Sequence, residues 1–218
     1  MKPQHSHKSE PNFDRVARLY RWAEYLSLGP LLQHTRVHFL PQLSKCCSAF
    51  VLGDGDGRFL ARLLAQNPSL HALAVDTSTT MLELLQERCA PANSRLHLQQ
   101  TSALAAVPPD DVDLIVTHFF LDCLTQTEVN ELAQRIAVQS TPGTLWLLSD
   151  FQVPQSRAVR PLARLYIRAL YFAFRLLTSL RVQHLPDPQE ALSHAGFQRI
   201  AQHERLFGMI YTELWKRE

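Results

Sequence analysis

Several features that would place this chain in a special class are missing. Its four cysteines, Cys46, Cys47, Cys89 and Cys123, form no C-x-x-C pair, so neither a paired-thiol metal site nor a redox motif is expected. No uninterrupted apolar run approaches the ~20 residues of a membrane span. The first ten residues lack the apolar core of a signal peptide. A formal net charge of +2 argues against the strongly basic surface typical of nucleic-acid-binding domains.

These absences narrow the class of protein. Unpaired cysteines behave as small buried hydrophobes and indicate a reducing compartment, so we expect a cytoplasmic protein, or one attached peripherally to the inner face of a membrane. With 218 residues and 46% hydrophobic content, the chain can bury one substantial core. His34 and His38 have the i, i+4 spacing of helical metal sites but no third ligand pattern, so no metal site is expected.

Glycine is scarce, and its placement is informative. Three of only seven glycines, Gly53, Gly55 and Gly57, stand on alternate positions after the apolar run 50–52, and a helical pattern begins with Leu60. This order predicts a strand, a tight turn and a helix. Glycine suits such a turn because it adopts backbone angles that other residues disfavour and lets a ligand approach the main chain closely.

A lone acid, Asp76, ends the next apolar run, where a βαβ unit offers a carboxylate to a ribose. The pattern therefore predicts a nucleoside-containing cofactor. A dinucleotide fingerprint needs a third glycine where this chain has Arg58 or Leu60, depending on the register. A nicotinamide-dependent oxidoreductase with an irregular turn stays open as an alternative.

The Gly-x-Gly-x-Gly turn followed by Asp76 resembles the first two motifs of the class I S-adenosylmethionine-dependent methyltransferases. The order of the later segments agrees: 96–103 resembles the third strand, 113–120 the fourth motif, 141–150 the Pro-Gly turn and fifth strand, and 196–215 the closing strands. The resemblance spans roughly residues 46–218. It implies an α/β, Rossmann-like three-layer sandwich with a mostly parallel seven-stranded sheet and an antiparallel last strand. Residues 1–45 would form a polar tail and a helical cap, with helices over 13–28 and from the Gly29-Pro30 break to about Leu43.

The resemblance also implies S-adenosylmethionine as cofactor and S-adenosylhomocysteine as product. In the loop, Asp54 and Asp56 would approach the positive amino group and sulfonium, Asp76 would chelate the ribose, and Ser102 would accept a bond from the adenine. Val51 and Ser102 stand where many members carry acids, which favours weaker binding or a non-catalytic scaffolding relative as alternatives. The implied cofactor-binding residues are Gly53, Asp54, Gly55, Gly57, Asp76, Thr77, Met81, Ser102, Ala103, His118, Phe119 and the aromatic Tyr20.

Two residues at strand ends are candidates for catalysis. His118 ends the fourth strand, and its ordinary pKa of ~6.5 suits a general base; lining the cofactor or filling the core is the alternative. Asp150 ends the fifth strand, where it would face the substrate or cap the next segment of the chain. Asp122 would orient His118 or begin the next helix.

An insertion at about 152–185 comes after the fifth strand. Arg157, Arg160, Arg164, Arg168 and Arg175 recur at helical spacing beside many apolar residues. Three interpretations stay open: a surface helix, a lid over the substrate, or a basic amphipathic helix that contacts a membrane surface. We expect a small, hydrophobic methyl acceptor, no nucleic acid partner, and either a monomer or an oligomer assembled through this insertion.

Overall fold

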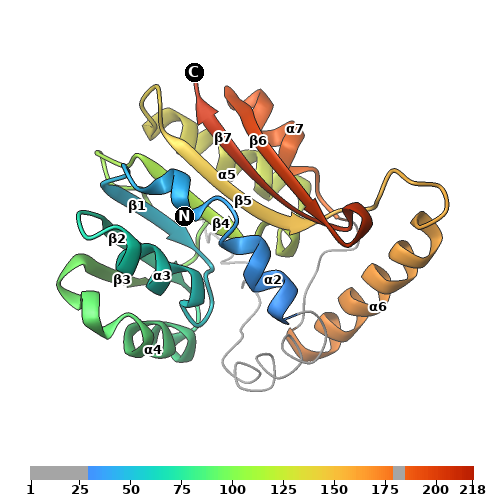
Figure 1. Ribbon diagram of the computed structural model, residues 1–218, viewed down its shortest axis with the longest axis horizontal. Helices are drawn as coiled ribbons and strands as arrows, with labels where there is room; N and C mark the ends of the chain where they lie inside the picture. The colour runs from blue at the N-terminus through green and yellow to red at the C-terminus, as the bar shows by residue number, and fades with distance from the viewer. Residues whose placement is uncertain (1–28, 179–184) are drawn as a thin grey trace, which may run out of the picture.

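The computed structural model describes residues 29–178 and 185–218, and a seven-stranded sheet forms its centre (Figure 1). The strand order is β3-β2-β1-β4-β5-β7-β6. The first five strands are parallel, and β7 pairs antiparallel with both β5 and β6. The predicted mostly parallel sheet is therefore confirmed. The strands are β1 (Ser48–Leu52), β2 (His71–Asp76), β3 (Leu96–Gln100), β4 (Leu114–His118), β5 (Leu145–Phe151), β6 (Phe197–Arg205) and β7 (Ile210–Arg217).

Helices cover both faces of the sheet. The α-helices are α2 (Gly29–Arg36), α3 (Arg58–Gln66), α4 (Thr79–Arg88), α5 (Gln126–Gln139), α6 (Arg160–Thr178) and α7 (Pro188–His194). Short 3-10 turns lie at η1 (Leu40–Leu43), η2 (Ala90–Arg95), η3 (Leu121–Cys123) and η4 (Leu206–Gly208). None of the helices in the described ranges has the length and hydropathy that a membrane crossing needs.

The residues of strand β1 after Ser48 are all apolar because both faces of the strand are buried. Ala49 and Val51 pack in the cluster that contains α3, whereas Phe50 and Leu52 pack in the cluster that contains α5 and α7. A central parallel strand is covered on both faces, so it reads as a continuous apolar run rather than an alternating one. The three-layer α/β architecture expected from the sequence is confirmed.

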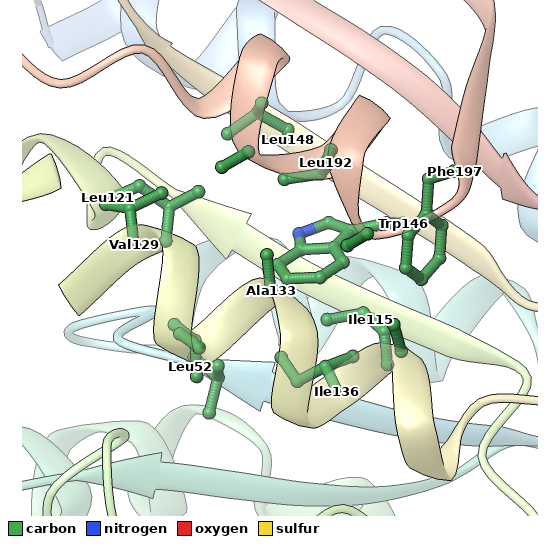
Figure 2. Close-up of a cluster of buried hydrophobic side chains, with 14 of the residues drawn as sticks. Leu52, Ile115, Leu121, Val129, Ala133, Ile136, Trp146, Leu148, Leu192 and Phe197 are labelled. Carbon is green, nitrogen blue, oxygen red and sulfur yellow. The ribbon is translucent and has the colours of Figure 1, made fainter. Parts of the chain in front are cut away.

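The larger core centres on Trp146 of β5, which lies among side chains of α5, α7 and the neighbouring strands (Figure 2). Its ring meets the Phe197 ring edge-on, with centroids 5.4 Å apart. Its indole N–H donates to the Thr117 hydroxyl at 2.9 Å, and both side chains are fully buried. One polar contact thus ties β4 to β5 in the middle of the core.

The N-terminal cap differs from the prediction. The second helix was expected to run to about Leu43, but α2 ends at Arg36, and the chain then forms turns that lead into η1. Pro41 has no amide hydrogen to donate to the Val37 carbonyl, so an α-helix does not continue through it; the Leu40 amide donates to that carbonyl instead, at 3.1 Å, at the start of η1. The predicted first helix, 13–28, lies outside the described residues.

The helical insertion after β5 is confirmed as α6, which extends away from the sheet in Figure 1. Arg157 precedes the helix, so the predicted cationic stripe starts at Arg160 rather than at Arg157. The side chain of Arg175 lies outside the described residues.

The buried Trp146–Thr117 hydrogen bond gives a stability test. Thr117→Val keeps the shape of the side chain but leaves the indole N–H without an acceptor, so it should lower the free energy of unfolding by about 1–3 kcal/mol. Urea titration measures this loss. In a Trp146→Phe background the same substitution should cost clearly less, because the donor is gone; equal costs in both backgrounds would show that the bond contributes nothing.

Candidate active site

The predicted site residues collect at one edge of the sheet, where the parallel strands end. Gly53 follows β1, Asp76 ends β2, His118 ends β4 and Asp150 lies near the end of β5. Register joins these ends, because Leu52 pairs with Val75, and His118 pairs with Ser149. The carboxyl edge of an open α/β sheet is the usual place for a ligand.

The glycine loop between β1 and α3 is built from left-handed backbone. Gly53, Gly55 and Gly57 have φ angles of 66°, 62° and 76°, which other residues rarely adopt. A Cβ on Gly53 would lie 2.5 Å from the Phe120 ring, and one on Gly57 would lie 2.8 Å from Leu85. A Cβ on Gly55 would meet nothing within 4 Å. The loop is therefore packed at both ends and open at its middle.

The two acidic residues of this loop, Asp54 and Asp56, form bonds that stabilise the loop. Asp54 is buried, and its carboxylate accepts a bond from the Leu60 amide at 3.0 Å, which caps the start of α3. Asp56 accepts from Arg58 at 3.0 Å and from Arg88 at 2.9 Å. Arg88 comes from α4, so this pair fastens the loop to the helix that follows β2.

Asp76 lies next to the glycine loop at the end of β2. The Gly53 amide donates to the Val75 carbonyl at 3.1 Å, which sets the loop against this strand end. The Asp76 carboxylate is half-buried, and one oxygen accepts from the Ser78 amide at 2.9 Å. Ser78 caps α4 by accepting from the Met81 amide. Thr77, the next residue, is half-buried, and Met81, five residues after Asp76, is buried.

The segment after β3 forms a turn at Ser102 and Ala103. The Ser102 hydroxyl accepts from the Leu104 amide at 3.0 Å, and Ala103 is buried. Arg135 of α5 donates to the carbonyls of Ala103, at 2.6 Å, and Leu104. A guanidinium from a distant helix therefore fixes the turn that faces the Asp76 end of the sheet.

Phe119 carries backbone strain at the end of β4. Its φ is 52°, a conformation that is rare for a bulky residue. Its amide donates to the Ser149 carbonyl at 2.7 Å, and its ring lies 5.2 Å from the Phe151 ring. Arg36 stacks over it, 5.1 Å from the ring centroid. Strain of this kind clusters at functional sites.

His118 lies beneath this surface with 2% of its area exposed. Ser149 donates its hydroxyl hydrogen to Thr212, 2.9 Å away, so it must accept from His118 Nδ1 at 2.9 Å. This fixes the Nδ1–H tautomer and leaves Nε2 as a buried lone pair, which has no hydrogen-bond partner among the described residues. Burial lowers the pKa of His118 well below its ordinary value, and Arg36 adds to the effect, so the ring is neutral at physiological pH.

Asp150 forms a buried carboxyl pair with Asp122 of η3. Asp150 is 1% exposed, and its oxygens accept from the amides of Phe151, at 2.8 Å, and Asp122, at 3.1 Å. Burial raises the pKa of Asp150 well above its ordinary value, and the charge of Asp122 raises it further. Such a pair holds one proton between two carboxyl groups.

Comparisons with known proteins agree with this geometry. The family model of the methyltransferase domain matches residues 50–143. These residues are therefore similar to a methyltransferase domain. The matched range contains the glycine loop, Asp76, the Ser102 turn and His118. The predicted resemblance to the class I S-adenosylmethionine-dependent methyltransferases is confirmed for the domain and its fold.

Solved methyltransferase structures show the same fold. The mitomycin 7-O-methyltransferase superposes with a TM-score of 0.68 at 16% identity, over 95% of this chain and 61% of that one. An O-methyltransferase family 2 protein from Planctomyces limnophilus, in complex with apigenin, gives 0.70 at 16% identity, over 94% and 62%. The Streptomyces davawensis N,N-8-amino-8-demethyl-D-riboflavin dimethyltransferase gives 0.66 at 18% identity, over 99% and 64%.

The chain spans about three fifths of the length of these methyltransferases. No curated protein matches the chain in sequence.

The sheet edge also contains several side chains that the sequence motifs do not reveal. Phe120 closes over Gly53, Arg135 holds the turn after β3, and the charge of Asp122 raises the pKa of Asp150. The sequence predicts that Asp122 orients His118 or begins the next helix. In the structure Asp122 lies in η3, and its amide donates to the Asp150 carboxyl group. Tyr20, predicted to cover the cofactor, lies outside the described residues.

The carboxyl pair predicts a pH dependence of stability. The unfolded chain releases the Asp150 proton near pH ~4, whereas the folded domain keeps it to a higher pH because the pKa is raised. The stabilising contribution is therefore complete below pH ~4 and is lost as the pH rises through the raised pKa. Asp122→Asn replaces a repelling carboxylate with an amide donor, so its unfolding free energy should fall less steeply with pH.

Urea unfolding between about pH 4 and pH 8 measures both slopes. The variant should gain stability over the parent protein as the pH increases. Asp110→Asn, at an exposed position, is the matched control and should run parallel to the parent. Parallel curves for Asp122→Asn would contradict the shared proton.

Proposed function

We propose that this domain transfers a methyl group from S-adenosylmethionine to a small, hydrophobic acceptor. One observation carries the proposal: the glycine loop is open at Gly55, where a side chain would meet nothing within 4 Å, and it lies beside Asp76 at the carboxyl edge of the sheet. Packing closes the same loop at Gly53 and Gly57. An open, glycine-lined main chain next to a carboxylate suits a nucleoside cofactor.

The residues present fit that cofactor. In this proposal Gly55 leaves room for the cofactor against the backbone, Asp76 holds the ribose hydroxyls, and the turn at Ser102 and Ala103 borders the adenine, while Thr77 and Met81 complete the wall beside Asp76. When bound, the sulfonium supplies an electrophilic methyl group. The protein then has to hold the acceptor in line and exclude water, which is mainly a matter of positioning.

We assign His118 and Asp150 to positioning rather than to proton removal. A general base must come within hydrogen-bond reach of the proton that it takes, and these side chains are only 2% and 1% exposed. His118 supports the strand end below Phe119 through its bond to Ser149. Asp150 holds η3, and hence Phe120, against the glycine loop through its bond to the Asp122 amide.

An apolar cluster at the same edge supports a hydrophobic acceptor. Leu32 of α2, Phe151 of β5 and Ile210 of β7 pack together, with Leu31, Phe119 and Leu185 against them. The structural neighbours named above are methyltransferases of mitomycin and of a riboflavin derivative, and one neighbour holds apigenin. These compounds are small, ring-containing molecules, as the apolar cluster would favour.

A second candidate function is cofactor binding without turnover. Burial of both His118 and Asp150 favours it, as does the Ser102 hydroxyl, which already accepts a bond from the protein backbone. Transfer of a labelled methyl group to a panel of phenols and aromatic amines separates the candidates: the proposed transferase gives labelled product, and a purely binding protein gives none while still taking up the cofactor.

The ribose contact predicts the effect of Asp76→Asn. Asparagine keeps an acceptor for the Ser78 amide, but it loses the charge and one of the two oxygens that would chelate the ribose. Calorimetry should show S-adenosylhomocysteine binding weakened by about tenfold or more, as expected for loss of a charge-assisted bond. Asp110→Asn at an exposed loop position is the control. Unchanged affinity in Asp76→Asn would overturn the proposed site.

The open loop predicts a contrast between two glycines. Gly55→Ala and Gly143→Ala both place a side chain on left-handed backbone, with φ of 62° and 98°, and neither Cβ meets a neighbour within 4 Å. Each should lose about 1–2 kcal/mol of unfolding free energy from backbone strain. Only Gly55→Ala should also lose affinity for S-adenosylhomocysteine in calorimetry. Equal affinity for both variants would place the cofactor elsewhere.

A further inference from the structure

The segment after β5 differs from the rest of the chain in its charge, because all of its charged residues are arginines. From Phe151 to Pro186 the sequence holds no Asp or Glu, while it holds six arginines: Arg157, Arg160, Arg164, Arg168, Arg175 and Arg181. All 20 acids lie outside it, together with only 16 of the 22 Lys and Arg residues. The domain therefore presents one cationic segment on an otherwise acidic molecule, and this asymmetry orients it toward an anionic partner.

Helix α6 has two apolar faces. Ala163 and Ile167 are buried against Met209, which holds the helix to the domain. Leu162 and Leu165 lie on a different face of the helix, where they are 70% and 65% exposed to solvent. The arginines at 160, 164 and 168 are also exposed, and by helical spacing they lie between the buried face and the exposed leucines.

The neighbouring β6–β7 hairpin adds a second exposed apolar group. At its tip, Leu206 and Phe207 are 37% and 79% exposed and have φ angles of 51° and 56°. Two consecutive bulky residues on left-handed backbone are strained. Met209, two residues on, belongs to the cluster that contacts α6, so the tip and the helix adjoin. Of the seven large hydrophobic residues exposed in the described ranges, four lie on these two elements.

We propose that α6 and the tip at Leu206 and Phe207 form a docking surface for an anionic lipid membrane. Arginines beside exposed leucines and a phenylalanine match a membrane interface, where acidic headgroups face the guanidinium groups and the apolar side chains enter the acyl boundary. A nucleic acid would use the arginines but would leave the leucines in water. Only the charge and the exposure of these residues support the docking surface, so the proposal does not depend on whether the domain transfers methyl groups.

Vesicle sedimentation of the full chain tests this proposal. The protein should bind vesicles of equal parts phosphatidylcholine and phosphatidylglycerol, should bind pure phosphatidylcholine far less, and should be released by salt as screening grows. Arg164→Gln with Arg168→Gln should weaken binding by roughly tenfold or more. Leu162→Gln with Leu165→Gln should weaken it as well, because the apolar contribution is lost.

One variant separates docking from folding. Phe207→Asn removes the exposed ring and places at this φ a residue that tolerates it, so stability should hold or increase while vesicle binding decreases. Val138→Gln, 84% exposed on α5, removes an equally exposed side chain elsewhere and should bind vesicles as the parent does. Equal binding to neutral vesicles, no binding at all, or a dimer in light scattering that the same substitutions dissociate would each overturn the proposal.

Discussion

The structure depends on one close approach, that of the Phe120 ring to the backbone of Gly53. With a Cβ at Gly53 the ring would lie 2.5 Å away, so strand β1 can meet the end of β4 at this distance only through glycine. Gly57 is required for the same reason, because a Cβ there would lie 2.8 Å from Leu85 of α4. Contacts therefore hold the loop at both ends, while its middle residue, Gly55, has no neighbour within 4 Å of an added Cβ. A preorganised opening of this kind costs no rearrangement when a ligand binds.

Behind the opening, buried polar groups fix the strand ends. The hydroxyls of Ser149 and Thr212 determine which nitrogen of His118 carries hydrogen, and the Asp122–Asp150 pair ties η3 to β5. Each group is almost fully removed from water, where an unpaired polar atom is costly. These bonds therefore fix the positions of the strand ends at the edge of the sheet. His118 and Asp150, which the sequence suggested as catalytic candidates, are thus buried in the protein interior.

The sequence predicts the parts of this arrangement that are local in the chain. Strand, glycine turn and helix succeed one another within 50–60, and Asp76 ends an apolar run, so both could be recognised without a structure. Phe120, Arg135 and Asp122 could not, because their roles arise from contacts between elements far apart in sequence, such as Arg135 with the carbonyl of Ala103. The early end of α2 was missed for a related reason: helical periodicity continued past Arg36, but Pro41 and the burial of Phe39 and Leu43 favour turns.

Backbone strain occurs at two places in the described residues, the end of β4 and the tip of the β6–β7 hairpin. Among the described residues other than glycine, only Phe119, Leu206 and Phe207 have positive φ, and each costs free energy that the surroundings must offset. At Phe119 the surroundings are evident: a 2.7 Å bond to the Ser149 carbonyl, the Phe151 ring and the Arg36 guanidinium. At the hairpin tip the support is the turn itself: Arg205 pairs with Ile210, and the Met209 amide donates to the Leu206 carbonyl at 3.1 Å. Positive φ at consecutive residues is the geometry of a tight hairpin turn, so the strain at the tip follows from the connection between β6 and β7, which leaves the Phe207 ring in water.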